Sequence, residues 1–457
     1  MIDLSCFKAY DIRGHVPSQL NGRFAFCLGQ AVAEVFAARH VMIGYDARLS
    51  GPKLSGALTA GLMEGDVRVT DIGLCGTEEI YYAAANKNCD AGIMITGSHN
   101  PADENGFKLV KKGAIPLSPL ELETLRDAVQ AFEARLKTEP CETQDSHRTS
   151  FRDEYIEWLL TYTGLRRLPE HARRLTIVTD AGNGCAGLVL KKLADFLPFD
   201  FVHLHAEPDG TFPNGVPNPL LPEKRSATVE AVREHKADFG LAWDGDFDRC
   251  FFYDNEGGFI EGYYCVGLLA SELLKDHPGA KIVHDPRLYW NTREMVLAHG
   301  GTPIMSKTGH AFMKARMRAE DALYGGEMSA HHYFREFAYC DSGMLPWLLM
   351  AKLLATSGQS LAEHVRERIA KYPCSGEINR RVLDPRALLQ HIHGRYASSC
   401  LQEDDLDGIS MEFQNWRFNL RPSNTEPLIR LNVESRGDSA LLEEKTKTLL
   451  DEIDAFS

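Results

Sequence analysis

The sequence has no excess of positive charge. Its 457 residues include 50 Lys and Arg against 64 Asp and Glu, which gives a formal net charge of −14. A chain with this charge repels nucleic acid and anionic membranes, so neither is expected as a partner. If the ligand is an anion, the cationic side chains that bind it must be gathered locally, against the overall field.

Long apolar runs and paired cysteines are also missing. No stretch reaches the length of a membrane span, and the opening MIDLSCFKAYDIRG lacks the basic and apolar regions of a secretory signal. The 11 cysteines form no Cys-x-x-Cys pair, which argues against a disulfide scaffold or a thiolate zinc site. Cys27 and Cys265 stand in apolar runs and are expected to be buried. We therefore expect a cytoplasmic protein.

Low-complexity tracts are absent, and the composition is that of a globular protein with several cores. Strand-like segments alternate with helical ones, which is typical of βαβ units and mainly parallel sheets. The alternation runs through three rounds that share element order but not residue identity. The expected strands are 41–46, 67–72 and 93–95, then 175–180, 201–205 and 239–243, then 281–285, 302–305 and 322–324; the first-round helices are 21–38, 52–64 and 77–87.

We predict an α/β protein with three related α/β modules and a smaller C-terminal α+β domain, around a central cleft. The modules have mainly parallel, mixed sheets. A polar linker at 136–150 follows the first module, and a second boundary near 368–376 precedes the C-terminal domain. The last segment carries strands at 411–413, 416–420 and 428–433 and a helix at 439–455. The predicted domains are 1–150, 151–256, 257–370 and 371–457.

A serine stands where the third strand of the first round ends. The segment reads Thr96-Gly97-Ser98-His99-Asn100-Pro101. Glycine lets the backbone approach a ligand, and proline ends the strand ladder. Open α/β sheets place their ligands at such strand ends, so Ser98 is a candidate nucleophile. Local composition alone favours the alternative, an ordinary polar turn, and the rest of the chain has to decide.

The third strand of the second round ends in three alternating carboxylates, Asp244, Asp246 and Asp248. Oxygen ligands favour magnesium, calcium or manganese over zinc. An EF-hand is excluded, because its glycine and its glutamate would fall on Arg249 and Asn255. A haloacid-dehalogenase aspartate nucleophile lacks its hydroxyl residue, since Asp248 stands there. An acidic surface turn is the remaining alternative, and the crowding of three acids favours metal binding over it.

Two further polar loops suit an anionic sugar. The segment 421–427 reads RPSNTEP and is followed by Arg430; hydroxyls, backbone N–H groups and arginines of this kind hold phosphate. The alternative is a polar turn between strands. Glu327, Ser329 and His331 alternate after the third round, and the carboxylate and hydroxyl suit vicinal sugar hydroxyls. His331 is a candidate base or phosphate contact; the alternative is a structural histidine, and the adjacent His332 makes the choice harder. Further cationic candidates, each also consistent with a surface charge, are Arg13, Lys108, Lys307 and His310.

Together these stretches resemble the α-D-phosphohexomutase superfamily, the phosphomannomutase and phosphoglucomutase enzymes. The resemblance spans the whole chain, with the motifs in order. Phe247 departs from it, because many members have glycine at this position of the metal loop. The motifs are Tyr10-Asp11-Ile12-Arg13-Gly14, the serine loop, Asp244-Gly245-Asp246-Phe247-Asp248-Arg249, Gly326-Glu327-Met328-Ser329-Ala330-His331 and Arg421-Pro422-Ser423-Asn424-Thr425-Glu426-Pro427.

The resemblance implies a phosphoryl-transfer reaction between hexose 6-phosphate and hexose 1-phosphate. It makes Ser98 a phosphoserine, with Mg2+ bound by the three aspartates and a phosphoryl oxygen on Ser98. A hexose 1,6-bisphosphate is the intermediate and the activating phosphate donor. Catalysis needs positioning and neutralised charge, which metal and cations supply. The implied catalytic residues are Ser98, Arg13, Lys108 and His331; the implied substrate contacts are Tyr10, His99, Arg249, Arg287, Lys307, His310, Glu327, Ser329, Arg421, Ser423, Asn424, Thr425 and Arg430.

The same resemblance assigns a task to each domain: phosphoserine, metal, sugar recognition and phosphate binding, in chain order. The Glu-Met-Ser of the sugar loop resembles members that act on mannose or glucose phosphates and that supply GDP-mannose. Sugar phosphates are the expected partners. Two alternatives are a metal-dependent sugar phosphatase, in which water takes the phosphoryl group from Ser98, and an inert sugar-phosphate binding protein.

Overall fold

The computed structural model describes residues 2–138, 146–423 and 428–456. By its internal contacts the chain divides into two compact units. The first unit comprises Met1–Phe259 and Tyr333–Gly358, and the second comprises Ile260–His332 and Gln359–Ser457. Each unit contains its own group of polar loops.

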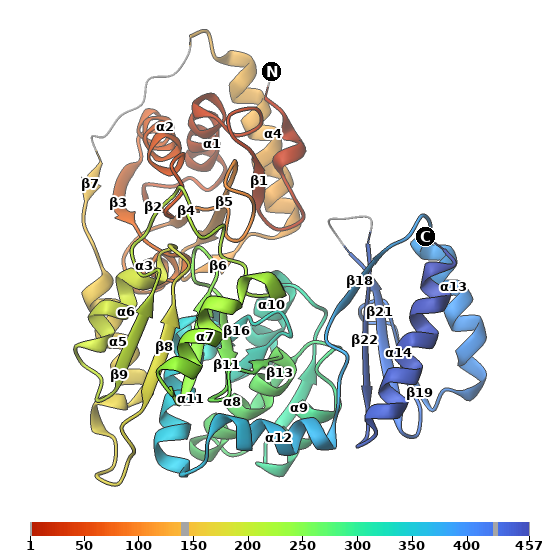
Figure 1. The fold of residues 1–457 in the computed structure, drawn as a ribbon. Helices are drawn as coiled ribbons and strands as arrows, with labels where there is room; N and C mark the ends of the chain where they lie inside the picture. Colours follow the sequence, from red (N-terminus) through yellow and green to blue (C-terminus); the bar gives the residue numbers. More distant parts are fainter. Residues whose placement is uncertain (1, 139–145, 424–427, 457) are drawn as a thin grey trace. The chain divides into compact units, whose positions relative to one another are not determined.

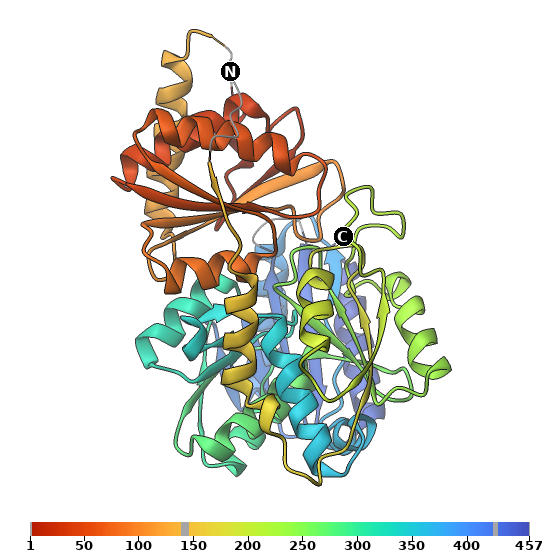
Figure 2. The same cartoon turned by 90° about the vertical axis from the view of Figure 1, so that its left-hand side faces the viewer.

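The first sheet of the first unit has seven strands in the order β1-β5-β4-β2-β3-β7, with β6 paired to β5. Strands β2, β3 and β4 are parallel, whereas β5 runs antiparallel to β4. Ala91, Ile93 and Ile95 of β4 join the core formed with α1, α2 and α4, and Gly92 faces α3 on the opposite side (Figures 1 and 2). The bounds are β1 (Ile12–His15), α1 (Gly22–Val35), β2 (His40–Tyr45), α2 (Gly51–Glu64), β3 (Arg68–Leu74), α3 (Thr77–Asn86), β4 (Ala91–Ile95), β5 (Glu104–Lys111), β6 (Ile115–Pro116), α4 (Pro119–Arg135) and β7 (His147–Arg148).

The second sheet of this unit is built around parallel strands β8, β9 and β10, with β11 antiparallel to β10. The returning segment of the chain contains the antiparallel pair β16–β17, which is not part of this sheet, and helix α11, which contacts α5 and β11. The bounds are α5 (Arg152–Thr163), β8 (Thr176–Asp180), α6 (Ala186–Ala194), β9 (Asp200–Leu204), α7 (Ser226–Glu234), β10 (Phe239–Trp243), β11 (Cys250–Tyr253), β12 (Phe259–Ile260), β16 (His332–Phe334), β17 (Cys340–Asp341) and α11 (Met344–Ser357).

The second unit contains the parallel strands β13, β14 and β15 and a separate antiparallel sheet of order β18-β22-β21-β20-β19. Helices α13 and α14 lie together on one side of the antiparallel sheet (Figure 1). The bounds are α8 (Gly262–Asp276), β13 (Lys281–His284), α9 (Trp290–Ala298), β14 (Thr302–Met305), α10 (His310–Glu320), β15 (Tyr324–Gly326), α12 (Leu361–Lys371), β18 (Ile378–Arg381), α13 (Pro385–Tyr396), β19 (Gln402–Asp404), β20 (Ile409–Glu412), β21 (Trp416–Pro422), β22 (Leu428–Ser435) and α14 (Ser439–Asp454).

Three of these sheets share one strand order. In each, the first strand of a round lies between the second and the third: β2 between β3 and β4, β8 between β9 and β10, and β13 between β14 and β15. The strand order therefore reverses between the first and third strands of each round. Open α/β sheets bind ligands at the carboxyl ends of the strands at such a reversal. Ser98, Asp244 and Glu327 each follow the third strand, so the predicted repeat and the equivalence of these loops are confirmed.

Local sequence explains several helix starts. Ser118 and Ser360 each accept a hydrogen bond from the backbone N–H three residues later, where Glu121 and Glu363 complete capping boxes. Strand β18 was not predicted, because its sequence INRR is partly exposed and has no apolar alternation. The predicted burial of Cys27 and Cys265 is confirmed. In the described part of the chain, no helix combines the length and apolar character needed to cross a membrane.

Candidate functional site

The serine loop holds Ser98 in a fixed and buried position. Ser98 lies directly beyond the buried strand β4, with a left-handed backbone (φ 49°), and its side chain is 2% exposed. Its N–H donates to Thr96 Oγ1 at 2.8 Å. Its hydroxyl donates to Asp244 Oδ2 at 2.8 Å and lies 3.1 Å from His99 Nδ1. The loop of the first sheet therefore meets the acidic loop of the second sheet at Ser98.

The acidic loop follows β10 and gathers its three carboxylates at one place. Asp244, Asp246 and Asp248 are all buried, and each offers an oxygen within 4.8 Å of the others. Phe247 turns the loop with a left-handed backbone (φ 50°), and its ring is buried. Burial raises the pKa of Asp244 to about 6, an effect that the nearby Arg249 opposes.

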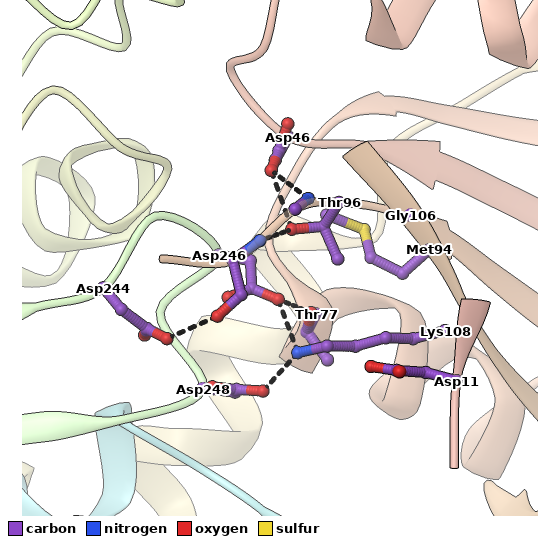
Figure 3. A network of polar contacts seen from close by, with 12 residues as sticks. Asp11, Asp46, Thr77, Met94, Thr96, Gly106, Lys108, Asp244, Asp246 and Asp248 are labelled. Atoms are coloured by element: carbon purple, nitrogen blue, oxygen red, sulfur yellow. Dashed lines mark hydrogen bonds and ion pairs between the residues drawn. The ribbon is translucent and has the colours of Figure 1, made fainter. Parts of the chain in front are cut away.

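Lysine and arginine neutralise these acids. Figure 3 shows Lys108 of β5 donating to Asp246 Oδ2 at 2.7 Å and to Asp248 Oδ2 at 2.5 Å. Arg249 donates to Asp244 Oδ2 through Nη2 at 2.7 Å. Burial acts to raise the pKa of Asp246, as does Asp248, but the bonds from Lys108 and other donors outweigh this and lower the pKa. The site thus contains acids and cations in direct contact, away from water.

The remaining predicted residues of the first unit border the serine. Arg13 of β1 donates to Asp11 Oδ2 at 2.7 Å and to Asn100 Oδ1 at 3.0 Å. Tyr10 is half-buried in the bend before β1. His99 Nδ1 lies 2.5 Å from Arg249 Nη2, and burial together with the cations around it holds the pKa of His99 well below its ordinary value. His99 is therefore neutral at physiological pH.

The acidic loop fits a hard divalent cation. All three side chains offer oxygen, which suits Mg2+ and does not suit a soft metal. Within the described residues, Oδ1 of Asp246 is buried and has no hydrogen-bond partner. A buried carboxylate oxygen without a donor is costly unless a cation contacts it. The residues present therefore match the predicted magnesium site in type, number and closeness.

The sugar loop of the second unit is a connected group of polar side chains. Buried Glu327 accepts a hydrogen bond from the N–H of Gly309 at 2.7 Å and lies 3.4 Å from His331 Nδ1. Ser329 Oγ lies 3.2 Å from the same histidine nitrogen. Gly309 stands between two other predicted contacts: Lys307, whose ammonium lies 5.1 Å from the Phe312 ring centre, and His310, the first residue of α10. Glu327, Ser329 and His331 are thus brought together, and Lys307 and His310 flank in sequence the glycine that bonds to Glu327.

Three predicted phosphate contacts of the second unit converge on one carboxylate. Arg287, Arg421 and Arg430 each donate to Glu377, at 2.5, 3.3 and 3.1 Å. Although burial alone would raise it, the pKa of Glu377 is lowered to about 2 by these guanidiniums. Arg421 and Arg430 are directly paired across β21 and β22. The structure describes Ser423, whose N–H donates to Leu428 O at 2.8 Å; the predicted contacts Asn424 and Thr425 lie outside the described residues.

Four family models match the chain in succession. They are the α/β/α domains I, II and III of phosphoglucomutase/phosphomannomutase, at residues 5–135, 153–258 and 261–372, and the C-terminal domain at residues 377–451. The chain belongs to the phosphoglucomutase/phosphomannomutase family. The predicted superfamily and the predicted fold class, three α/β domains with mixed sheets and a smaller C-terminal domain, are confirmed.

Relatives within this family align over nearly the whole chain. A protein of Xanthomonas campestris named phosphohexose mutases is 54% identical, with 98% of each chain covered. A phosphomannomutase of Salmonella montevideo is 53% identical, covering 98% of this chain and 99% of the relative. The crystal structure of a phosphoglucomutase/phosphomannomutase family protein from Burkholderia thailandensis superposes with a TM-score of 0.87 at 31% identity, covering 99% of this chain and 98% of that chain.

Residues of the first unit that contact the motifs of this phosphohexomutase without being predicted to do so include Thr77, Asp46 and Arg48. The Thr77 hydroxyl donates to Asp246 Oδ2 at 2.5 Å, and Asp46 Oδ2 accepts from the Thr96 hydroxyl at 2.7 Å. Arg48 donates to the backbone of the serine loop. All three follow parallel strands, β2 or β3, whose carboxyl ends lie at the same sheet edge as that of β4. This shared edge is the signal that points to them.

Proposed function

We propose that this phosphohexomutase acts on mannose phosphates, interconverting mannose 6-phosphate and mannose 1-phosphate, and that it also accepts glucose phosphates. The observation that carries the proposal is the position of Ser98. Its hydroxyl lies 2.8 Å from Asp244, in a buried cluster of three carboxylates that Lys108 joins. The names of the relatives support mannose as the sugar.

Ser98 acts as a reversible carrier of the phosphoryl group. The free hydroxyl of the hexose phosphate forms a bond to phosphorus while the bond from phosphorus to Ser98 Oγ breaks. The proton of the sugar hydroxyl ends on Ser98 Oγ, which then donates to Asp244 as the structure describes. The hexose 1,6-bisphosphate returns its other phosphate to Ser98, and this proton passes back to the sugar. Atoms and charge balance over the two transfers.

Residues around Ser98 supply the position and the charge that such a transfer needs. Asp244, Asp246 and Asp248 would hold Mg2+, which when bound neutralises phosphoryl oxygens. Lys108 and Arg13 provide fixed positive charge beside the loop. Arg249 holds His99 and Asp244 in their places through contacts of 2.5 and 2.7 Å.

Residues of the second unit bind the rest of the substrate. Glu327 and Ser329 receive the sugar hydroxyls, and His331, Lys307 and His310 contribute donors beside them. The phosphate that is not reacting binds to the Arg421–Arg430 pair together with Ser423, Asn424 and Thr425. Arg287 is engaged by Asp285 and Glu377, so its part is to hold the arginine group in place. We place the reaction in the cytoplasm, in the supply of mannose 1-phosphate for GDP-mannose.

An isomerisation assay tests the proposal. Mannose, glucose and glucosamine 6-phosphates are supplied separately, with Mg2+ and a catalytic amount of hexose 1,6-bisphosphate, and the 1-phosphates are measured over time. We expect mannose phosphate to be converted at least as well as glucose phosphate, and glucosamine phosphate poorly. Intact mass should show one added phosphoryl group on the protein, and Ser98→Ala should lose both that mass and several orders of magnitude of activity.

Two outcomes would contradict the proposal. Release of free mannose and inorganic phosphate in place of mannose 1-phosphate would indicate a phosphatase that uses water as the acceptor. Normal turnover by Ser98→Ala would show that Ser98 is not the carrier. Ser271→Ala is the matched control, because Ser271 is also buried but its hydroxyl donates to Leu268 O within α8.

A further inference from the structure

Arg48 is an arginine buried in the first unit without being a predicted site residue. It lies between the end of β2 and the start of α2, and its side chain is 1% exposed. Burial lowers its pKa, and Asp46 opposes that effect. Arginine stays charged in proteins, and a buried guanidinium is costly unless its donors are engaged. The partners of Arg48 therefore indicate what it does.

Four donors of the guanidinium reach backbone carbonyls of the serine loop. Nη2 donates to Ser98 O at 3.0 Å and to Asn100 O at 2.6 Å. Nη1 donates to Pro101 O at 2.5 Å and to Glu104 O at 2.8 Å. One side chain thus holds the segment 98–104 by its main chain, including the carbonyl of the phosphoryl carrier.

The fifth donor faces Asp46, which holds the other end of the same loop. Arg48 Nε lies 3.4 Å from Asp46 Oδ2, and the same carboxylate accepts from Thr96 Oγ1 at 2.7 Å and from Gly97 N at 3.3 Å. Thr96 Oγ1 in turn accepts the N–H of Ser98. Asp46 and Arg48 together fix the main chain on both sides of Ser98, as Figure 3 shows for the Asp46 side.

The fit leaves no spare room around the guanidinium. A Cβ on Gly97 would lie 2.5 Å from Arg48 Cζ, so the glycine permits the arginine to reach the loop. Ser98 has the left-handed backbone that side chains rarely adopt, which costs free energy unless surrounding contacts impose it. The Phe212 ring, 5.5 Å from Cζ, completes the enclosure.

We propose that Arg48 is the positioning residue for the phosphoryl carrier, because it holds the strained serine loop by its backbone carbonyls. Ser98 Oγ then stays beside the acidic loop in both directions of phosphoryl transfer. This inference rests on the proposed function of Ser98. Arg48 does not touch the substrate, because it is buried beneath the loop. Its removal therefore affects transfer and leaves the affinity for sugar phosphate in place.

Arg48→Lys is the first test, because lysine keeps the charge but offers three donors that cannot reach four carbonyls. A shift of about 1 Å in a reacting group costs about 100-fold in rate. We expect kcat to fall by about that factor while KM for mannose 6-phosphate changes by less than about threefold. Hydrogen exchange should rise in the peptide covering 97–106 and stay unchanged in β8–β10.

Gly97→Ala tests the same contact from the other side, since its Cβ displaces the guanidinium without removing it. It should show the same fall in kcat and the same local rise in exchange. Arg152→Lys is the matched control: Arg152 also donates to a carbonyl, Leu74 O at 2.8 Å, away from the serine loop. Its kcat should stay near that of the unsubstituted protein even if it melts at a lower temperature.

The outcomes separate this inference from the proposed function. If the unsubstituted protein does not isomerise mannose phosphate, the proposed function fails, and exchange in 97–106 still decides whether Arg48 holds the loop. Unchanged exchange there in Arg48→Lys and Gly97→Ala would overturn the inference. So would a kcat that falls no more than in Arg152→Lys, because Arg48 would then serve stability alone.

Discussion

A neutral side chain, Thr77, orients one of the three aspartates. Its hydroxyl donates to Asp246 Oδ2 at 2.5 Å, and its N–H donates to Asp246 O at 3.1 Å. Lys108 Nζ also donates to Asp246 Oδ2, so the hydroxyl of Thr77 and the ammonium of Lys108 bond to the same oxygen. Groups that bond to metal-binding carboxylates from outside fix the direction in which those carboxylates present their other oxygen. Thr77 is therefore expected to influence metal binding without touching the metal.

Replacing Thr77 by valine removes the hydroxyl and keeps the shape. Loss of such an outer contact typically costs about 10–100-fold in metal affinity. We expect Thr77→Val to need that much more Mg2+ for half-maximal mutase activity, with a smaller change in kcat at saturating Mg2+. The measurement is a Mg2+ titration after treatment with a chelator.

Thr228→Val provides the comparison, because the Thr228 hydroxyl also donates to a carboxylate, Asp180 Oδ2 at 3.0 Å, outside the acidic loop. Its Mg2+ requirement should match that of the unsubstituted protein. Equal titration curves for all three proteins would show that Asp246 needs no help from Thr77.

Residue types in their local context predict part of the site. Three alternating acids after a strand point to a metal regardless of what surrounds them, and Ser98 at a strand end points to a nucleophile. Thr77 carries no such signal, because its partner Asp246 lies 169 positions away. The residue type of Arg48 is equally uninformative, since its partners are backbone carbonyls, which every residue possesses. For both residues, only the position after a parallel strand points to the site. Roles that depend on tertiary neighbours cannot be predicted from local sequence.

At the scale of elements, α3 and α11 are joined by a buried carboxylate. Glu78, in the first turn of α3, accepts from the N–H groups of Gly343 and Met344 at the start of α11, at 2.7 and 3.0 Å. The hydroxyls of Ser342 and Tyr155 donate to its other oxygen. Burial raises the pKa of Glu78 to about 8, although these hydrogen bonds act to lower it. Burial and the four hydrogen bonds at this junction therefore act on the pKa of Glu78 in opposite directions, and burial prevails.

This junction predicts a pH dependence of stability. The pKa of Glu78 is 4.5 when the chain is unfolded and about 8 when it is folded, so the folded state binds the extra proton between these values. The contribution of Glu78 is fully present below about pH 4.5 and is lost as pH rises through 8. Glu78→Gln mimics the protonated acid. We expect its free energy of unfolding to rise relative to that of the unsubstituted protein as pH increases from 5 to 8, by about 1.4 kcal/mol per pH unit.

Urea unfolding at a series of pH values measures this difference. Glu123→Gln on the exposed face of α4 is the control, and its difference from the unsubstituted protein should not vary with pH. A constant difference for Glu78→Gln as well would show that Glu78 is ionised throughout and acts as a charged cap of α11.

At the scale of the molecule, the predicted metal site and the predicted phosphate contacts lie in different compact units. The acidic loop and all the described partners named for it belong to the first unit, and the arginines around Glu377 belong to the second. A ligand that binds only the native state stabilises the part of the chain that holds it, by about 2.7 kcal/mol at 100 times its dissociation constant. Mg2+ should therefore act on one unit alone.

Hydrogen exchange with Mg2+ or with chelator checks this expectation. Protection should rise with Mg2+ in peptides covering 76–110 and 239–250 and stay constant in 378–456. Asp246→Asn should abolish the gain, because it replaces one of the three carboxylates. Protection gained in the C-terminal sheet, or none anywhere, would contradict the assignment of Mg2+ to the acidic loop.

The order of strands and helices can be predicted from the sequence more closely than the boundaries between domains. Element order predicts the three rounds because each strand and helix has a strong local pattern, and the strand order of the sheets confirms them. The predicted boundaries 1–150, 151–256, 257–370 and 371–457 stay a prediction. Residues 333–358 belong by contacts to the first unit although they follow 260–332 in the chain, which no local pattern indicates.

The grip of Arg48 on main-chain carbonyls has an evolutionary consequence. A contact to a carbonyl does not depend on which side chain the residue carries, so substitutions at the exposed Ala102 and Asp103 leave the contacts of Arg48 to the loop in place. Ser98 then keeps its place while these neighbouring side chains vary. The serine loop separates what must be preserved from what is open to selection.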